Sequence, residues 1–386
     1  MIAYSMNTMP PAAAAAEITM ENVKRARAFH QSFPEYFPTP LVDMAALAKA
    51  LGLGEVRVKD ESKRFGLNAF KVLGASYAMG KYLAKSYGIL DDALRLDTIK
   101  AAQAAGKPVH FYAATDGNHG RAVAWTAAKL GQPASIFMPE GSSEERLNNI
   151  KATGAYAEIT DMNYDDAVRF AAAQAEKTGG VIIQDTAWEG YEEIPLNIMA
   201  GYGVIADEAL ECGFMPTHVF LQAGVGSFAG GIAGAFRAYC KTSGRQMPKI
   251  IVAESDRADC YYRSALAADG KPRFVGGEMR TLMAGLACGE PNPIAFDILR
   301  NEVSCFVSCG DKVAADGMRI LSSMGVTSGE SGAVTCGLLA HICMELPELK
   351  KELGLNELSR VLLISTEGDT DKQRYQDIVW FGRSNL

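Results

Sequence analysis

The chain has 386 residues, a formal net charge of −7 at pH 7 and 48% hydrophobic residues. This length exceeds one domain of about 150 residues, so we expect roughly two domains with sizeable cores. The acidic balance argues against nucleic acid as a partner, because a phosphate-binding surface must be basic. The longest apolar runs are too short for a membrane-spanning helix, so no membrane partner is expected either.

The first 20 residues lack a basic segment before an apolar stretch, so they do not predict a secretory signal. Prolines 10 and 11 and the alanine run at 12–16 indicate a loose leader. The eight cysteines are expected to be reduced thiols in a cytoplasmic protein. Cys305 and Cys309 stand four residues apart, but no second Cys or His pair completes a zinc set, so we expect no metal site.

Apolar runs alternate with amphipathic stretches along the chain. The predicted strands are 56–59, 109–113, 134–138, 156–159, 181–184, 218–222, 250–254, 303–307 and 361–365. The predicted helices are 73–87, 120–129, 143–153, 164–178, 194–212, 229–241, 311–323 and 332–344. Strands that alternate with helices of this length are typical of βαβ units and parallel sheets.

The spacing of the strands favours two sheets over one very wide sheet. We predict an α/β protein with two open, mostly parallel sheets and helices on both faces. The short, closely spaced strands between 109 and 159 predict a small inserted domain at 76–187, and residues 1–75 and 188–386 would form the large domain. Active sites of open α/β sheets lie at the carboxyl ends of strands, so the cleft between the domains is the expected site.

Lys71 stands between the apolar residues Phe70 and Val72 at the start of a predicted helix. A lysine at such a position is usually solvated. A lysine held in an apolar site has a lowered pKa and becomes nucleophilic, as a lysine that forms a covalent bond to a carbonyl must be. Its competitors stand among charges or on a helix surface. They are Lys59, Lys63 and Lys81.

The turn Asp116-Gly117-Asn118-His119 joins a predicted strand to a predicted helix. Gly and Asn tolerate positive φ, and Asp or Asn commonly caps a helix. Taken alone, the turn is better explained by capping than by catalysis. His119 is expected to pack or to form a hydrogen bond, and not to act as a base.

The segment Gly224-Val225-Gly226-Ser227 follows an apolar strand and precedes a helix of small residues. Glycines let backbone N–H groups converge on an anion, and the start of the helix adds positive partial charge. The Gly-Lys-Ser/Thr ending of a P-loop is absent. The segment therefore predicts a phosphate site, and the alternative is a tight turn with small residues for packing.

These three segments, in this order and spacing, resemble the fold-type-II pyridoxal-phosphate enzymes. The resemblance implies that pyridoxal 5′-phosphate is the cofactor and that Lys71 binds it covalently. It also implies that Asn118 donates a hydrogen bond to the oxygen on the cofactor ring, and that the backbone of 224–227 holds the phosphate. The ring nitrogen is expected to meet a hydroxyl of Ser365 or Thr366, of which Thr366 is favoured.

Within that group, five segments resemble the diaminopropionate ammonia-lyases. They are 60–71, 114–121, 184–191, 283–293 and 365–371. The resemblance implies α,β-elimination of both isomers of 2,3-diaminopropionate to pyruvate and ammonia, in a protein that is a homodimer.

Three residues are the expected catalytic groups. Lys71 would take the Cα proton of the L isomer, and Asp116 would take it from the D isomer on the opposite face. A carboxylate beside the β-ammonium group would bind it and relay a proton, and Asp116 and Asp185 are the candidates.

Two alternatives remain at this point. A serine/threonine dehydratase would act on β-hydroxy amino acids and has no need of Asp116 and Asp185. A non-catalytic pyridoxal-phosphate-binding protein needs only the lysine and the phosphate loop.

Overall fold

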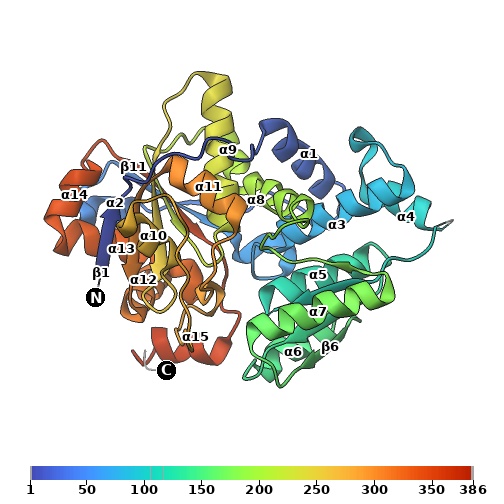
Figure 1. Ribbon diagram of the computed structural model, residues 1–386. Helices are drawn as coiled ribbons and strands as arrows, with labels where there is room; N and C mark the ends of the chain where they lie inside the picture. The colour runs from blue at the N-terminus through green and yellow to red at the C-terminus, as the bar shows by residue number, and fades with distance from the viewer. Residues whose placement is uncertain (1, 105, 116, 384–386) are drawn as a thin grey trace.

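The computed structural model describes residues 2–104, 106–115 and 117–383, whose strands form two separate sheets (Figure 1). The large sheet has the order β1-β10-β9-β8-β11-β3-β2, with β1 and β2 antiparallel at its edges and the inner strands parallel. Its strands are β1 (Ile2–Met6), β2 (Leu41–Asp43), β3 (Glu55–Asp60), β8 (His218–Gln222), β9 (Lys249–Ser255), β10 (Val303–Cys309) and β11 (Arg360–Ser365).

The small sheet is all parallel, with the order β6-β5-β4-β7. Its strands are β4 (Phe111–Ala114), β5 (Ala134–Met138), β6 (Tyr156–Ile159) and β7 (Val181–Ile182). The predicted α/β class with two mostly parallel sheets is therefore confirmed. The boundaries of the inserted domain, 76–187, stay a prediction.

Helices connect the strands and cover the sheets (Figure 1). The α-helices are α1 (Met20–His30), α2 (Ala45–Leu51), α3 (Val72–Tyr87), α4 (Leu96–Gln103), α5 (Asn118–Lys129), α6 (Glu144–Lys151), α7 (Tyr164–Thr178), α8 (Glu193–Glu211), α9 (Ser227–Ser243), α10 (Cys260–Ala267), α11 (Pro293–Glu302), α12 (Asp311–Ser323), α13 (Glu330–Glu345), α14 (Pro347–Leu353) and α15 (Lys372–Val379). Short 3₁₀ turns are η1 (Glu61–Gly66), η2 (Asp91–Ala93) and η3 (Ala284–Leu286). Over the described residues, no helix combines the length and apolar content needed to cross a bilayer.

The loose leader predicted at residues 10–16 contains no helix or strand, as expected. Residues 2–6, where no strand was predicted, form one. This segment is strand β1, which pairs antiparallel with β10 so that Tyr4 lies opposite Val307. The pairing satisfies backbone hydrogen bonds at the edge of the sheet and needs no particular side-chain pattern. Short elements such as β2, α2 and α14 were missed for a related reason, because few residues carry their periodicity.

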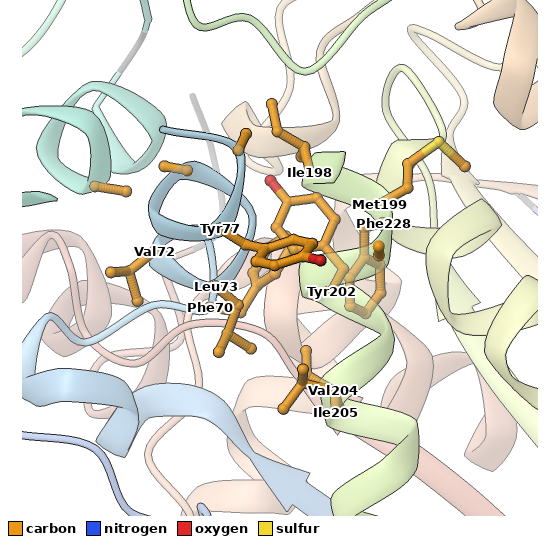
Figure 2. Close-up of a cluster of buried hydrophobic side chains, with 14 of the residues drawn as sticks. Phe70, Val72, Leu73, Tyr77, Ile198, Met199, Tyr202, Val204, Ile205 and Phe228 are labelled. Carbon is orange, nitrogen blue, oxygen red and sulfur yellow. The ribbon is translucent and has the colours of Figure 1, made fainter. Parts of the chain in front are cut away.

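The helices α3, α8 and α9 pack through one apolar cluster (Figure 2). The ring of Tyr202 lies 4.8 Å from that of Phe70, the ring of Phe228 lies 4.7 Å from Phe70, and the rings of Tyr202 and Phe228 lie 6.4 Å apart. Gly74 permits this packing, because a Cβ there would stand 2.6 Å from side-chain atoms of Ile198 and Tyr202. The start of α3, where Lys71 stands, is thereby fixed against α8.

A buried cluster of charges lies next to this packing. Arg64 Nη1 and Nη2 donate to the two carboxylate oxygens of Glu208, each at 2.8 Å, and Arg64 Nε donates to Glu61 at 2.8 Å. Lys59 Nζ also donates to Glu208, at 2.5 Å. Two cations therefore balance two carboxylates away from water. Lys59 is thus buried in an ion network, whereas its alternating sequence context had indicated an ordinary charged strand.

We expect Glu208→Gln to destabilise the protein by about 3–5 kcal/mol at neutral pH, because Arg64 and Lys59 lose the carboxylate that they share and one buried positive charge is no longer balanced. Burial raises the pKa of the Glu208 carboxyl, but Arg64 and Lys59 outweigh this and lower it to about 2. Stabilisation from Glu208 is therefore fully present above the usual carboxyl pKa and is lost as the pH falls towards 2. Urea unfolding at several pH values measures both effects.

The control is Glu193→Gln, which removes an exposed partner of Lys85 and should cost less than about 1 kcal/mol. Equal losses in the two variants, or a loss at Glu208 that does not shrink in acid, would contradict the prediction.

Candidate functional site

A cavity of about 560 Å³ lies where the two sheets meet. The residues that directly follow β8, β11 and β4 line this cavity, and so does Asp185, which follows β7. The cavity therefore lies at the carboxyl ends of strands from both sheets, as expected for open α/β structures. Residues from the two sides that face it include Lys71, Asn118, Asp185, Ser227 and Thr366.

Lys71 and Asp185 form an ion pair in this cavity. Lys71 stands immediately before α3, and its backbone is held on one side by a bond from Phe70 N–H to the Thr366 carbonyl, 3.1 Å. The lysine side chain is 22% exposed and Asp185 is 6% exposed. The Lys71 side chain therefore faces the cavity from an otherwise buried pair.

The pKa shift of Lys71 differs from the expected one. Burial lowers the pKa of the ammonium group, but the Asp185 carboxylate and its hydrogen bond outweigh burial and raise the pKa. Burial likewise raises the pKa of Asp185, and Lys71 overcomes this and lowers it to about 2. The apolar neighbours in the sequence predicted a lowered lysine pKa, and that prediction was wrong because Asp185, distant in the sequence, contacts the amine.

The loop 224–227 leads into the start of α9. Gly226 precedes the helix with φ +94°, and a Cβ there would lie 2.0 Å from the Tyr261 hydroxyl. Tyr261 Oη and Asn292 N–H both donate to the Val225 carbonyl at 2.8 Å. These two bonds hold the Val225 carbonyl within the protein. The first N–H groups of a helix have no partners within the helix, so they are available to a bound group. The loop therefore fits an anion.

The Ser227 side chain has a different partner from the one expected. Its hydroxyl donates to the Asp185 carbonyl and accepts a bond from Asn292 Nδ2 at 2.7 Å. In this arrangement, the N–H groups of the loop and not the Ser227 hydroxyl are the donors for an anion. The Ser227 hydroxyl instead joins the phosphate-type loop to the strand end that carries Asp185.

Asn118 opens α5 and reaches across the cavity. Its Nδ2 donates to Glu367 Oε2 at 2.6 Å. His119, the next residue, is buried and its Nε2 lies 2.7 Å from the Ile183 carbonyl. The expectation that His119 forms a hydrogen bond inside the protein is confirmed. The predicted base Asp116 lies outside the described residues, while its neighbour Thr115 lines the cavity.

Of the two hydroxyls considered for the cofactor ring nitrogen, Thr366 lines the cavity. Ser365 is directed elsewhere, because its hydroxyl bonds to Ser328 Oγ at 2.7 Å. Gln222 Nε2 donates to Thr366 Oγ1 at 3.0 Å. The threonine oxygen therefore accepts one bond from the protein, which leaves its own O–H free to donate.

Sequence reasoning assigned no individual role to several polar residues of the cavity wall, among them Gln222, Glu330 and Glu367. Burial and the nearby Glu367 carboxylate raise the pKa of Glu330 to about 7. Glu367 belongs to a segment that resembled the ammonia-lyases, but no single-residue pattern indicated its side-chain contact with Asn118. Gln222 ends an apolar strand, and a polar residue at the end of a buried strand was a usable signal.

These residues fit pyridoxal phosphate. The helix start at 224–227 suits a phosphate, Lys71 supplies the amine for an aldehyde, and Thr366 supplies a hydroxyl for a ring nitrogen. Gln222 Oε1 is buried and is without a hydrogen-bond partner among the described residues, although its Nε2 is fully engaged by acceptors. A buried acceptor in a cavity wall indicates a site built for a polar ligand.

Comparisons with known proteins agree with this geometry. The family described as pyridoxal-phosphate dependent enzyme matches residues 33–367. The chain is 48% identical to the diaminopropionate ammonia-lyase of Escherichia coli K12, over 95% of this chain and 93% of the relative. It is 50% identical to that of Salmonella typhimurium LT2, over 92% of this chain and 91% of the relative. The crystal structure of the E. coli diaminopropionate ammonia lyase in complex with D-serine matches with a TM-score of 0.91 at 44% identity, covering 100% of this chain and 98% of that one.

Gly226→Ala should weaken binding of pyridoxal phosphate at least tenfold, because the added methyl would push Tyr261 or the loop out of place. The matched control is Gly213→Ala, at φ +75° with no atom within 4 Å of the new Cβ. Both variants carry the cost of positive φ, roughly 1–2 kcal/mol, but only the first disturbs the loop. Urea unfolding and absorbance titration with the cofactor measure stability and affinity separately. Equal cofactor affinity in the two variants would rule out this account of the loop.

Proposed function

Because the chain belongs to the pyridoxal-phosphate dependent enzymes, and within them to the diaminopropionate ammonia-lyases, we propose that it degrades both D- and L-2,3-diaminopropionate. One substrate and one water give pyruvate and two ammonia molecules. The Lys71–Asp185 pair supports this proposal most strongly. It lies in a cavity whose wall also contains the N-terminus of α9, where an anion can be held. The protein is thus a pyridoxal-phosphate-dependent ammonia-lyase, and the use of both isomers is the finer proposal.

The cofactor would be held by Lys71, Asn118, Thr366 and the backbone of 224–227. When bound, it supplies an electron sink that acidifies the Cα proton of an attached amino acid. The protein then has to hold the substrate, remove that proton and help the β-amine to leave. Side chains of the protein perform these three tasks.

Lys71 takes the Cα proton of the L isomer. Its amine reaches the cavity from the start of α3, and its ion pair with Asp185 keeps it there. A base removes a proton efficiently only when it is positioned within hydrogen-bond reach, and Lys71 extends into the cavity from the residue just before α3. Lys71 serves one face of the substrate.

Asp116 takes the Cα proton of the D isomer from the other face. In the sequence it lies between Thr115, which lines the cavity, and Gly117, the residue that precedes α5. A carboxylate can serve as a base when burial keeps its pKa from falling too low. Two bases on opposite faces are the simplest way for one cavity to act on both isomers.

Asp185 binds the β-ammonium group and keeps it protonated, so that the β-nitrogen leaves as ammonia when its bond to Cβ breaks. Lys71 lowers the pKa of this carboxyl, so Asp185 is ionised in the pair and already holds one ammonium group at this place. An amine leaves readily only when protonated, so a carboxylate beside it suits a diamino substrate. A hydroxy amino acid has no second ammonium group for Asp185 to bind.

The protein is proposed to be a homodimer in the cytoplasm. All eight cysteines are free thiols, and several lie inside the large sheet or its covering helices. Buried thiols of this kind are typical of proteins in a reducing compartment. Size-exclusion chromatography with light scattering tests the dimer.

The purified protein should show a visible absorbance band that disappears in Lys71→Ala, and it should release pyruvate from both isomers of 2,3-diaminopropionate. Asp116→Asn should lower turnover of the D isomer roughly 10²–10⁴-fold, the usual contribution of a positioned base, and leave the L isomer nearly unchanged. Pyruvate release and the spectrum can be followed in one cuvette.

Asp161→Asn is the control, since Asp161 is an exposed aspartate in the loop between β6 and α7. Equal loss of both isomers in Asp116→Asn would reject the two-base scheme. Pyruvate formed only from serine, or 2-oxobutanoate only from threonine, would move the protein to the dehydratases. A cofactor band without turnover of either class would indicate a non-catalytic binding protein.

A further inference from the structure

In the wall of the cavity, a carboxylate that follows a strand of the large sheet meets an amide from a helix beside the small sheet. Asn118 begins α5, beside the small sheet, and Glu367 follows β11 of the large sheet. The bond from Asn118 Nδ2 to Glu367 Oε2 is 2.6 Å long, and both residues line the cavity. The mechanism above does not use Glu367.

This contact decides which way the Asn118 amide faces. An asparagine side chain ends in a donor NH₂ and an acceptor oxygen, and a rotation of 180° about its last bond exchanges them at little cost. A carboxylate offers only acceptor oxygens, so the NH₂ must face it. One of the two N–H bonds of Asn118 is then directed at Glu367, and the second is left for another acceptor.

Glu367 is itself held in place. Its carbonyl accepts bonds from Gly329 N–H at 3.0 Å and from Ser365 Oγ at 3.3 Å. Thr370 Oγ1 donates to its carboxylate at 3.4 Å. A Cβ on Gly329 would lie 3.0 Å from Glu367 Cγ, so the segment before α13 closes over this side chain. Glu367 is only 7% exposed, so its side chain has little freedom to move and can hold the Asn118 amide in one orientation.

We propose that Glu367 is a positioning residue that orients Asn118, so that the second N–H of the amide points to the oxygen on the pyridoxal-phosphate ring. The inference rests on the proposed function, in which Asn118 donates to that oxygen. Without Glu367, the amide can turn its own oxygen towards the ring oxygen, and two acceptors would face each other. Glu367 therefore acts on the cofactor only through Asn118.

The test measures the affinity of the apoenzyme for pyridoxal phosphate by absorbance titration, independently of turnover. Glu367→Ala should weaken binding roughly tenfold, as expected for one hydrogen bond involving a charged group. Glu367→Asp keeps the charge but is one methylene too short to reach Asn118, and should weaken binding to a similar extent. Glu367→Gln can accept through its amide oxygen but can also present its NH₂, so it fixes the Asn118 amide less firmly and should weaken binding by an intermediate amount, about threefold.

A double-mutant cycle separates positioning from a general structural role. Asn118→Ala alone should weaken cofactor binding, and adding Glu367→Ala to it should cause no further loss. Glu278→Ala is the matched control, since Glu278 is an exposed carboxylate on the same cavity wall, and it should bind the cofactor as the parent does. Melting temperatures identify any variant whose loss reflects unfolding, and the Asp and Gln variants decide the question if Glu367→Ala does not fold.

Parent-like affinity in both Glu367→Ala and Glu367→Asp, or losses that add in the double variant, would overturn this inference and leave the proposed function intact. A parent apoenzyme that binds no pyridoxal phosphate would instead overturn the proposed function, and this inference with it.

Discussion

The buried ion network around Arg64 and Glu208 is the constraint on which the site depends. Arg64 and its partner Glu61 belong to the turn that leads from β3 towards Lys71, and Glu208 belongs to α8. The same helix packs its apolar residues against the start of α3 (Figure 2). The segment that leads to Lys71 is therefore attached to α8 by both polar and apolar contacts. Moving the turn away from α8 would separate Arg64 and Lys59 from Glu208 inside the protein, so the network opposes that movement.

Positive and negative groups lie on different parts of the cavity wall. The start of α9 and the loop before it present N–H groups, which favour a phosphate. Asp185 and Glu367 lie on the wall near Lys71 and Asn118, and they favour amines and amide N–H groups. Since anion and cation sites are adjacent but separate, a phosphate-bearing cofactor and a substrate with two amino groups can be held in one cavity without like charges meeting.

Residues from both sheets complete the site. The Ser227 hydroxyl bonds to the Asp185 carbonyl, and Asn118 bonds to Glu367, so two hydrogen bonds connect the sides at the cavity itself. Each bond joins a residue expected to bind the cofactor to the opposite side of the molecule. Relative displacement of the two sides would therefore disturb the phosphate loop and the ring contact together. This arrangement couples the packing of the two sheets to the order of the site.

The sequence alone determined the α/β class, most strands and helices, and the loop 224–227, because these depend on local periodicity and on glycines next to a strand end. The resemblance of whole segments supplied Lys71, Asn118, Asp185 and Thr366. Only the tertiary structure decided that Asp185 raises the pKa of Lys71, that Ser227 bonds to Asp185, and that Glu367 faces Asn118. These contacts join residues 42 to 249 positions apart, and no local pattern encodes a partner at that distance. The strand at residues 2–6 follows the same rule, because backbone pairing with β10 and not its own side chains makes it a strand.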